Sequence, residues 1–249
     1  MSEEKLKAVA LIPARSGSKV IPQKNFKMFC GKPLVSWTAM VAIESGIFEK
    51  VIVSMDGGWD LVDWKSADPR MLKKYNGVLK IDNDRPDTLA SDTATLDSLL
   101  VYYRNKKEYK NVEAWCVLQP TSPLRTATDI RKAYRKISAK KWDSVVSVIQ
   151  DPMMGWVDDA LKFNIKKKGA AICLYNYLFR PNRQKRMHWF RETGSIYFCK
   201  YYVIDSFHCR IGAEICLLEL PKENSVEIDD EFDWKMAEYL MEDRLNGSK

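Results

Sequence analysis

The chain has 249 residues, 46% hydrophobic and 29% charged, which is enough to bury a core without disulfides or structural metals. Forty Lys and Arg against 33 Asp and Glu leave a net charge of +7, which favours anionic partners. No stretch reaches the ~18 apolar residues of a membrane span, and the first residues lack the pattern of a signal peptide. We therefore expect a cytoplasmic protein that makes no use of a membrane, with its six cysteines reduced and mostly buried.

The N-terminal part of the chain predicts a βαβ unit. Residues 8–14 (AVALIPA) form a continuous apolar run, which is typical of a strand buried on both faces. A helix is predicted from Pro33 to Gly46, and residues 50–56 (KVIVSMD) form a second buried strand. The helical spacing is carried by Leu34, Trp37, Met40, Val41 and Ser45. A helix between two strands implies that the strands pair in parallel.

The same alternation continues to residue 149. The next segments with helix or strand patterns are 91–109, 114–119, 126–137 and 144–149. Ser91 or Asp92 is expected to cap the first helix, and Thr126 with Asp129 has the spacing of a capping box for the second. The predicted fold class is α/β: a three-layer, doubly wound domain with a mostly parallel sheet.

The rest of the chain completes one domain over residues 1–249. Between about 150 and 191 the periodicity fades, so we expect residues 151–190 to be an excursion that serves dimerisation and substrate binding. Strands return at 194–200 and 216–220. A closing helix over about 230–245 is predicted, with Phe232, Met236, Tyr239 and Leu240 on one face.

Two further features limit the function classes. The basic clusters at 166–168 and 180–186 are candidates for a nucleic-acid surface, but cations and acids alternate along the chain, which makes nucleic acid an unlikely partner. Only His188 and His208 are present, which argues against a His-dependent triad or a His-rich metal site.

The loop after the first strand carries the strongest chemical signal. It contains Arg15, Lys19 and Lys24 around a single glycine, with no GxGxxG and no P-loop spacing. Loops at the carboxyl ends of parallel strands bind ligands, and exposed N–H groups beside a glycine can hold phosphate oxygens. From charge alone, a solvated basic loop explains the pattern equally well.

Seven stretches in order resemble the sugar-acid cytidylyltransferases, specifically the CMP-sialic acid synthetase (acylneuraminate cytidylyltransferase) family. They are IPARSGSKVIPQKN (12–25), GKPLVSWT (31–38), VIVSMD (51–56), LASDTAT (89–95), LQPTSPLRTATDI (118–130), RETGSIYF (191–198) and VEIDDEFDW (226–234). The resemblance implies a nucleotide-diphospho-sugar transferase type of fold. It also implies transfer of CMP from CTP to the anomeric hydroxyl of a sialic-type (nonulosonic) sugar acid, with release of pyrophosphate, Mg²⁺ as cofactor and a homodimer.

The resemblance also assigns residues. CTP binding is carried over to Arg15, Gly17, Ser18, Lys19, Lys24, Asn25, Arg85, Ala90 and Ser91. Sugar binding is carried over to Gln119, Arg191 and Gly194, while Arg125 is expected to be a structural ion-pair partner. Arg15, Lys24 and Asp229 are the expected catalytic residues.

The metal is expected on Glu227 and Asp229, because alternation on an extended segment puts the two carboxylates on one face. Asp230, Glu231 and Asp233 are explained by the start of a helix. The family usually has Asp at position 227 and Gly at position 20, where this chain has Glu and Val.

Three readings stay open. The acceptor could instead be Kdo, Kdn, legionaminic acid or pseudaminic acid, with the poorly matched 151–188 segment setting the choice. The chain could be a non-catalytic basic protein that binds nucleotides or nucleic acid, or an inactive relative. The carboxylates near Asp229 argue against a nucleic-acid cleft, since they repel a phosphate backbone.

Overall fold

The computed structural model describes residues 5–57, 77–91, 93–139, 141–151 and 189–247, together with the backbone of 156–157 and 172–173. The chain divides into two compact units, residues 1–148 with 192–249 and residues 149–191. In the smaller unit, β8 (Trp156–Val157) pairs antiparallel with β9 (Ile172–Cys173). Both basic clusters, and most of the predicted excursion at 151–190, lie outside the described residues.

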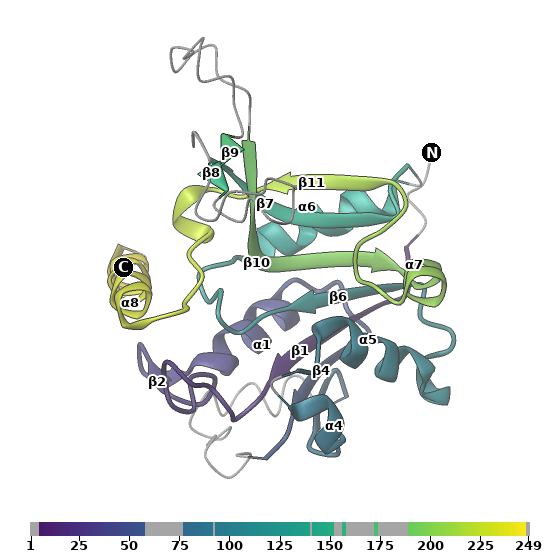
Figure 1. Ribbon diagram of the computed structural model, residues 1–249, viewed down its shortest axis with the longest axis horizontal. Helices are drawn as coiled ribbons and strands as arrows, with labels where there is room; N and C mark the ends of the chain where they lie inside the picture. The colour runs from purple at the N-terminus through teal and green to yellow at the C-terminus, as the bar shows by residue number, and fades with distance from the viewer. Residues whose placement is uncertain are drawn as a thin grey trace. The chain divides into compact units, whose positions relative to one another are not determined.

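The larger unit is built on a mostly parallel sheet (Figure 1). Its strands are β1 (Ala8–Ala14), β4 (Lys50–Met55), β5 (Leu79–Asp82), β6 (Ala114–Leu118), β7 (Ser144–Asp151), β10 (Trp189–Lys200) and β11 (Ile215–Glu219). They lie in the order β11-β7-β10-β6-β1-β4-β5. β1 pairs in parallel with β4 and β6, β4 with β5, and β11 with β7, whereas β10 runs antiparallel to β6. The predicted fold class is confirmed.

Helices cover both faces of this sheet. Val9 and Leu11 of β1 pack in one cluster with α5 (Leu96–Asn105) and α7 (Tyr201–Phe207). Ala10 and Ile12 pack on the other face with α1 (Leu34–Glu44) and α6 (Ala127–Ser138). Because successive side chains of a strand point to opposite faces, the continuous apolar run of β1 is buried on both sides.

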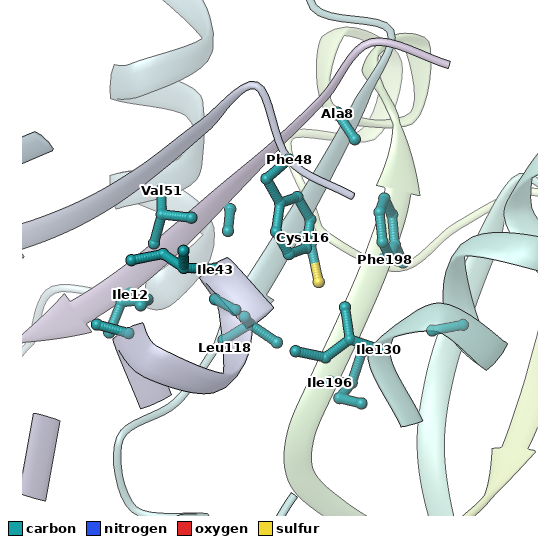
Figure 2. Close-up of a cluster of buried hydrophobic side chains, with 14 of the residues drawn as sticks. Ala8, Ile12, Ile43, Phe48, Val51, Cys116, Leu118, Ile130, Ile196 and Phe198 are labelled. Carbon is teal, nitrogen blue, oxygen red and sulfur yellow. The ribbon is translucent and has the colours of Figure 1, made fainter. Parts of the chain in front are cut away.

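The cluster on the α1 and α6 face is the largest part of the core. Figure 2 shows Ile12 and Val51 beside Ile43, while Ile130 packs near Ile196. Each of these side chains is at most 7% exposed. The β-branched residues of neighbouring strands thus interlock with one stripe from each helix, which fixes both helices on the sheet.

A third cluster joins the loop after β1 to α8 (Glu231–Gly247). Ile21 from that loop and Ile228 from the segment before α8 are both fully buried, and both pack with Trp234 of the helix. The cluster also includes Phe29 and Leu34, next to the hairpin of β2 (Met28–Phe29) and β3 (Lys32–Pro33). The loop after β1 and the C-terminal helix α8 therefore share one small hydrophobic core.

Most predicted elements are present near their expected bounds, with β1, β4, β6 and α6 within one or two residues. The capping box is confirmed: Thr126 Oγ1 accepts from Asp129 N at 3.2 Å, and Asp129 Oδ2 accepts from Thr126 N at 3.0 Å. The sequence reasoning missed β2, β3, β5, β8, β9, α4 (Asp87–Ala90), α7 and a short 3-10 helix at 222–224, and residues 107–109, expected in the preceding helix, form a separate 3-10 turn.

Two helix predictions need correction. The helix expected from Ser91 begins at Leu96, because the Thr95 hydroxyl caps it by accepting from Ser98 N at 3.0 Å. In α8 three of the four residues expected on the apolar face are exposed, Phe232, Met236 and Tyr239, and only Leu240 packs against the third cluster. The buried positions are instead Trp234, Ala237 and Met241, since the third cluster lies on that side of the helix.

The cysteines fit a reduced protein over the part of the chain that is described. Cys30, Cys116, Cys199, Cys209 and Cys216 are all free thiols there, and three of them are buried. Burial and the nearby acids Glu238 and Glu242 raise the pKa of Cys30 to about 11, which leaves that thiol protonated at neutral pH. No helix among the described residues combines the length and apolar character needed to cross a membrane.

Candidate active site

A cleft of about 320 Å³ lies beyond the carboxyl ends of the central strands. β1 has β4 on one side and β6 on the other, so the strand order reverses between β1 and β6. Open α/β sheets bind ligands at such a reversal. The polar residues that line the cleft are Arg15, Ser18, Lys24, Asn25, Arg85, Ser91, Thr95, Gln119, Thr121, Glu227 and Asp229.

The loop after β1 is held in place by its own backbone and by β4. Asn25 Nδ2 donates to the carbonyl of Arg15 at 2.9 Å, which closes the loop. Ser16 N donates to Asp56 Oδ1 at 2.7 Å, directly after β4. Because Ile21 in the middle of the loop is fully buried, the basic loop is anchored to the core of the protein and is not simply a mobile, solvent-exposed segment.

Arg85 brings a second cation into the cleft from the segment after β5. Its side chain is 7% exposed, and its Nε donates to Ser54 Oγ at 3.2 Å. Burial lowers the pKa of Arg85, while the charge of Asp56 opposes that shift. Ser54 and Asp56 lie at the end of β4, so one strand end positions both the basic loop and Arg85.

Glu227 and Asp229 reach the cleft from the two sides of a buried anchor. Ile228 between them is fully buried, and its N–H donates to the carbonyl of Thr121 at 2.7 Å. Its own carbonyl accepts from Lys24 Nζ at 2.7 Å. Since side chains alternate along an extended segment, burying Ile228 turns both neighbouring carboxylates towards the cleft.

The acids that follow belong to the start of α8, as the sequence indicates. Asp230 Oδ1 accepts from the N–H groups of Phe232 and Asp233 at 2.8 and 3.0 Å. Asp233 Oδ2 accepts in return from Asp229 N and Asp230 N at 3.0 and 3.2 Å. This reciprocal cap uses the side chains of Asp230 and Asp233, and it holds the backbone of Asp229 while leaving its carboxylate at the cleft.

Gln119 and Gly194 form a close-packed pair beside Glu227. Gln119 Nε2 donates to the carbonyl of Gly194 at 2.8 Å. Gly194 has φ +64°, and a Cβ there would lie 2.3 Å from Glu227 Oε1 and 2.8 Å from Gln119 Nε2. Only glycine satisfies both the backbone conformation and this packing.

Arg125 lies behind this pair and is 1% exposed. Its Nε donates to Ser195 Oγ at 3.0 Å, its Nη1 donates to Thr38 Oγ1 at 3.3 Å, and its Nη2 donates to the carbonyl of Gln119. Burial lowers its pKa to about 9, and the nearby groups Cys116, Glu227 and Asp129 oppose that shift. The expectation of an ion pair is wrong: among the described residues no carboxylate lies within salt-bridge distance of Arg125.

Two buried oxygens at the cleft have no hydrogen-bond partner within the described parts of the chain. They are Asn25 Oδ1 and Thr121 Oγ1. Buried polar atoms are nearly always satisfied, so unsatisfied ones at a cleft mark positions where a ligand can supply the missing partner. The sequence pointed to Asn25 but not to Thr121, whose signal is its place directly after β6.

The cleft brings together most of the residues that the sequence singles out. Arg15, Ser18, Lys24, Asn25, Arg85, Ser91, Gln119, Glu227 and Asp229 line it. Gly17, Lys19 and Ala90 are neighbours of lining residues in the chain and do not line it themselves. Arg191 belongs to the smaller unit, where its Nε lies 3.7 Å from Asp151 Oδ2.

Comparison with known proteins places this arrangement in context. Residues 9–58 match the family model described as Cytidylyltransferase. The chain is 30% identical to N-acylneuraminate cytidylyltransferase A of Danio rerio over 234 residues, which cover 92% of this chain and 49% of that protein. It is 28% identical to CMP-N,N'-diacetyllegionaminic acid synthase of Legionella pneumophila, with coverage of 95% and 97%. The chain spans about half the length of several relatives that it matches.

The fold has solved counterparts as well. A structure of CMP:2-keto-3-deoxy-manno-octonic acid synthetase complexed with CTP superposes with a TM-score of 0.61 at 16% identity, over 96% of this chain and 99% of that one. At this level of identity the match concerns the fold alone. The resemblance drawn from the sequence motifs is confirmed: the chain is similar to N-acylneuraminate cytidylyltransferases over nearly all of its own length, and residues 9–58 match the Cytidylyltransferase family model.

Proposed function

We propose that this chain is a nucleotidyltransferase that transfers CMP from CTP to the anomeric hydroxyl of a nonulosonic acid of the sialic type. In this reaction the anomeric oxygen forms a bond to the α-phosphorus of CTP, and the bond from that phosphorus to the departing pyrophosphate breaks. Such chemistry depends on positioning and charge neutralisation rather than on a covalent enzyme intermediate. The observation that carries the proposal is the meeting of Lys24 with the Glu227–Asp229 segment in one cleft.

The CTP side of the proposal rests on the cations of the cleft. Arg15 and Lys24 from the loop after β1, together with Arg85, are suited to neutralise a triphosphate. Lys24 donates one hydrogen bond to Ile228 O, and an ammonium has two further N–H groups for phosphate oxygens. Charge that develops on departing pyrophosphate would be stabilised by these fixed donors. We propose that CTP is also bound by neighbouring residues of the same segments, namely Gly17, Ser18, Lys19, Asn25, Ala90 and Ser91.

The donor set at residues 227–229 fits a divalent cation, and we propose Mg²⁺. Mg²⁺ in phosphoryl-transfer sites is held by one or two carboxylates, with the remaining positions taken by water and phosphate oxygens. Glu227 and Asp229 both line the cleft, which supplies the two carboxylates of such a shared site. When bound, the ion would supply positive charge to the phosphate oxygens. The two carboxylates would hold it, and the charge of Lys24, which lines the same cleft, would limit their mutual repulsion.

The acceptor side of the proposal is the Gln119–Gly194 pair. The Gln119 amide can both donate to and accept from a polyhydroxylated substrate, and its Nε2 is already oriented by Gly194 O. Arg191 is proposed to bind the sugar-acid carboxylate, because a planar guanidinium matches a carboxylate in a bidentate manner. We further propose that residues 151–190 mediate a homodimer.

A release assay tests the proposal. We expect pyrophosphate release from CTP and MgCl₂ when a nonulosonic acid is added, and none without an acid acceptor or after addition of excess EDTA. The panel includes N-acetylneuraminic, legionaminic, pseudaminic, Kdn and Kdo acids. Lack of turnover with every acid, combined with salt-sensitive binding of RNA or DNA, would overturn the proposal in favour of a binding protein.

A legionaminic-type acceptor is the second candidate. It is favoured by one observation: the relative from Legionella pneumophila has 97% of its length covered by this chain, whereas the vertebrate relatives are about half covered. Comparing kcat/KM for legionaminic and N-acetylneuraminic acids under the same conditions separates the two candidates.

A further inference from the structure

Arg125 is a buried cation whose cost must be offset by something other than an ion pair. It is 1% exposed, and in the part of the chain described here it donates only to neutral oxygens. Burying a charge without an opposite charge in direct contact is expensive, and well-packed apolar residues usually stabilise a core as well or better. Stability alone therefore does not account for a guanidinium at this position.

The three partners of Arg125 come from three different elements. Thr38 belongs to α1, Gln119 follows β6, and Ser195 lies in β10. A guanidinium presents its donors in a fixed planar fork, whereas the three donors of a lysine ammonium rotate about one nitrogen and an amide has only two. Arg125 thus sets the position of the β6 end relative to β10.

Two of these partners lead directly to the cleft. The Gln119 carbonyl is held by Arg125, while the amide of the same residue lines the cleft and donates to Gly194 O. Ser195 follows Gly194, whose α-carbon packs against the Glu227 carboxylate. A further hydrogen bond between the segment after β6 and β10, from Ser122 Oγ to Thr193 O at 3.3 Å, supports the same arrangement.

We propose that Arg125 is a positioning residue for the acceptor side of the cleft. It fixes the Gln119 amide against Gly194 and, through that packing, fixes the Glu227 carboxylate, without touching substrate itself. The enzyme kinetics that test this inference rest on the proposed function. The hydrogen-exchange measurement that tests it rests on the geometry alone.

The kinetic experiment compares Arg125→Met with Arg104→Met. Arg104 is a matched control, because it is also buried (6% exposed) and hydrogen-bonded, but to Asp205 and the carbonyls of Tyr109 and Lys110, away from the cleft. For Arg125→Met we expect the KM for the sugar acid to rise about tenfold or more and kcat to fall, since small misplacements near the chemistry can reduce rates about 100-fold. The Kd for CTP, measured by calorimetry without added divalent metal, should stay within about twofold, because the cations proposed to bind CTP are not partners of Arg125.

For Arg104→Met we expect a lower melting temperature, with the KM for the sugar acid, kcat and the Kd for CTP all unchanged. A purely structural role for Arg125 would give the same result as this control: lower stability and unchanged KM per folded molecule. Wild-type KM and kcat in a folded Arg125→Met protein would overturn the inference and leave the proposed function intact. If Arg125→Met does not fold, Arg125→Lys replaces it. Retention of the charge without the fork should still raise the acceptor KM, and wild-type kinetics for Arg125→Lys would overturn the inference.

A second measurement does not require turnover. Hydrogen exchange should accelerate in peptides covering residues 114–122 and 192–198 in the Arg125 variant, and not in Arg104→Met. If the wild-type protein turns over no acid, the proposed function fails and this readout still decides the positioning role. Equal exchange in both variants would reject it.

Discussion

The Nζ of Lys24 lies 2.7 Å from the carbonyl oxygen of Ile228, the residue between Glu227 and Asp229. This bond joins the basic loop after β1 to the acidic segment before α8, which are more than two hundred positions apart in the chain. A cation and two carboxylates thereby line one cleft before any ligand arrives. Preorganised charge of this kind needs little rearrangement during a reaction.

Loss of the Lys24 ammonium should reduce turnover strongly. We expect Lys24→Met to lower kcat/KM for CTP by about 100-fold to 1,000-fold, the range found when a charge-stabilising donor is removed from an active site. Steady-state pyrophosphate release measures it. Lys132→Met, at an exposed position of α6, is the control and should match wild type. Equal activity of the two variants would contradict a role for Lys24 in phosphate binding.

The two neighbouring acids should separate activity from stability. Asp229→Ala removes a carboxylate that lines the cleft, so we expect a loss of turnover of about 100-fold or more with little change in the free energy of unfolding. Asp230→Ala removes a helix cap and should lower the free energy of unfolding by about 1 kcal/mol, with turnover within a few-fold of wild type. Urea denaturation and the release assay together test the pair, and the reverse pattern would refute our assignment of the carboxylates.

Gly194 and Gly46 provide a matched pair of substitutions at similar backbone angles, φ +64° and +67°. A Cβ at Gly46 meets no atom within 4 Å, so Gly46→Ala should lose only about 1 kcal/mol of stability from the left-handed backbone. Gly194→Ala adds a clash with Glu227 and Gln119, so a larger loss and a raised acceptor KM are expected. Thermal unfolding and acceptor kinetics should separate the two, and equal effects would mean that the packing around Gly194 is not needed.

The Asp82–Lys106 ion pair should produce an acid-sensitive part of the stability. The two groups are 3.0 Å apart, and Asp82 is 5% exposed. Burial alone would raise the pKa of Asp82, but the hydrogen bonds from Lys106 and from Asp84 N outweigh it and lower the pKa below its usual value. Because the folded protein binds the proton less tightly than the unfolded chain, this carboxylate stabilises the fold above its unfolded pKa of about 3.9. The contribution is lost as the pH falls through the lower folded pKa.

Asp82→Asn tests this pH dependence. We expect it to lower the free energy of unfolding at pH 7 by about 1–3 kcal/mol, because it weakens a hydrogen bond to a charged group and leaves Lys106 partly unpaired. Urea titrations at each pH should also show a smaller loss of stability in the variant than in the wild-type protein as the pH falls below about 5. Glu49→Gln, at an exposed position, is the control. A parallel decline in all three proteins would show that Asp82 does not carry the effect.

Local patterns determined most of the secondary structure. The apolar run of β1 and the Thr126–Asp129 capping box identify their elements because the interactions involved are between near neighbours in the chain. The exposed face of α8 shows where this reasoning ends: Phe232 and Tyr239 have helical spacing, yet Trp234 and Met241 are the buried residues. Which side of a helix meets the core depends on what the rest of the chain places there.

The candidate site follows the same division. Residue type and motif order were enough to predict the α/β alternation, the basic character of the loop after β1 and most of the polar residues that line the cleft. The neutral partners of Arg125, the packing of Glu227 against Gly194 and the bond from Lys24 to Ile228 became visible only in the folded domain. These contacts join segments distant in the chain, and burial and distance between such segments are set by packing of the whole domain rather than by local preference.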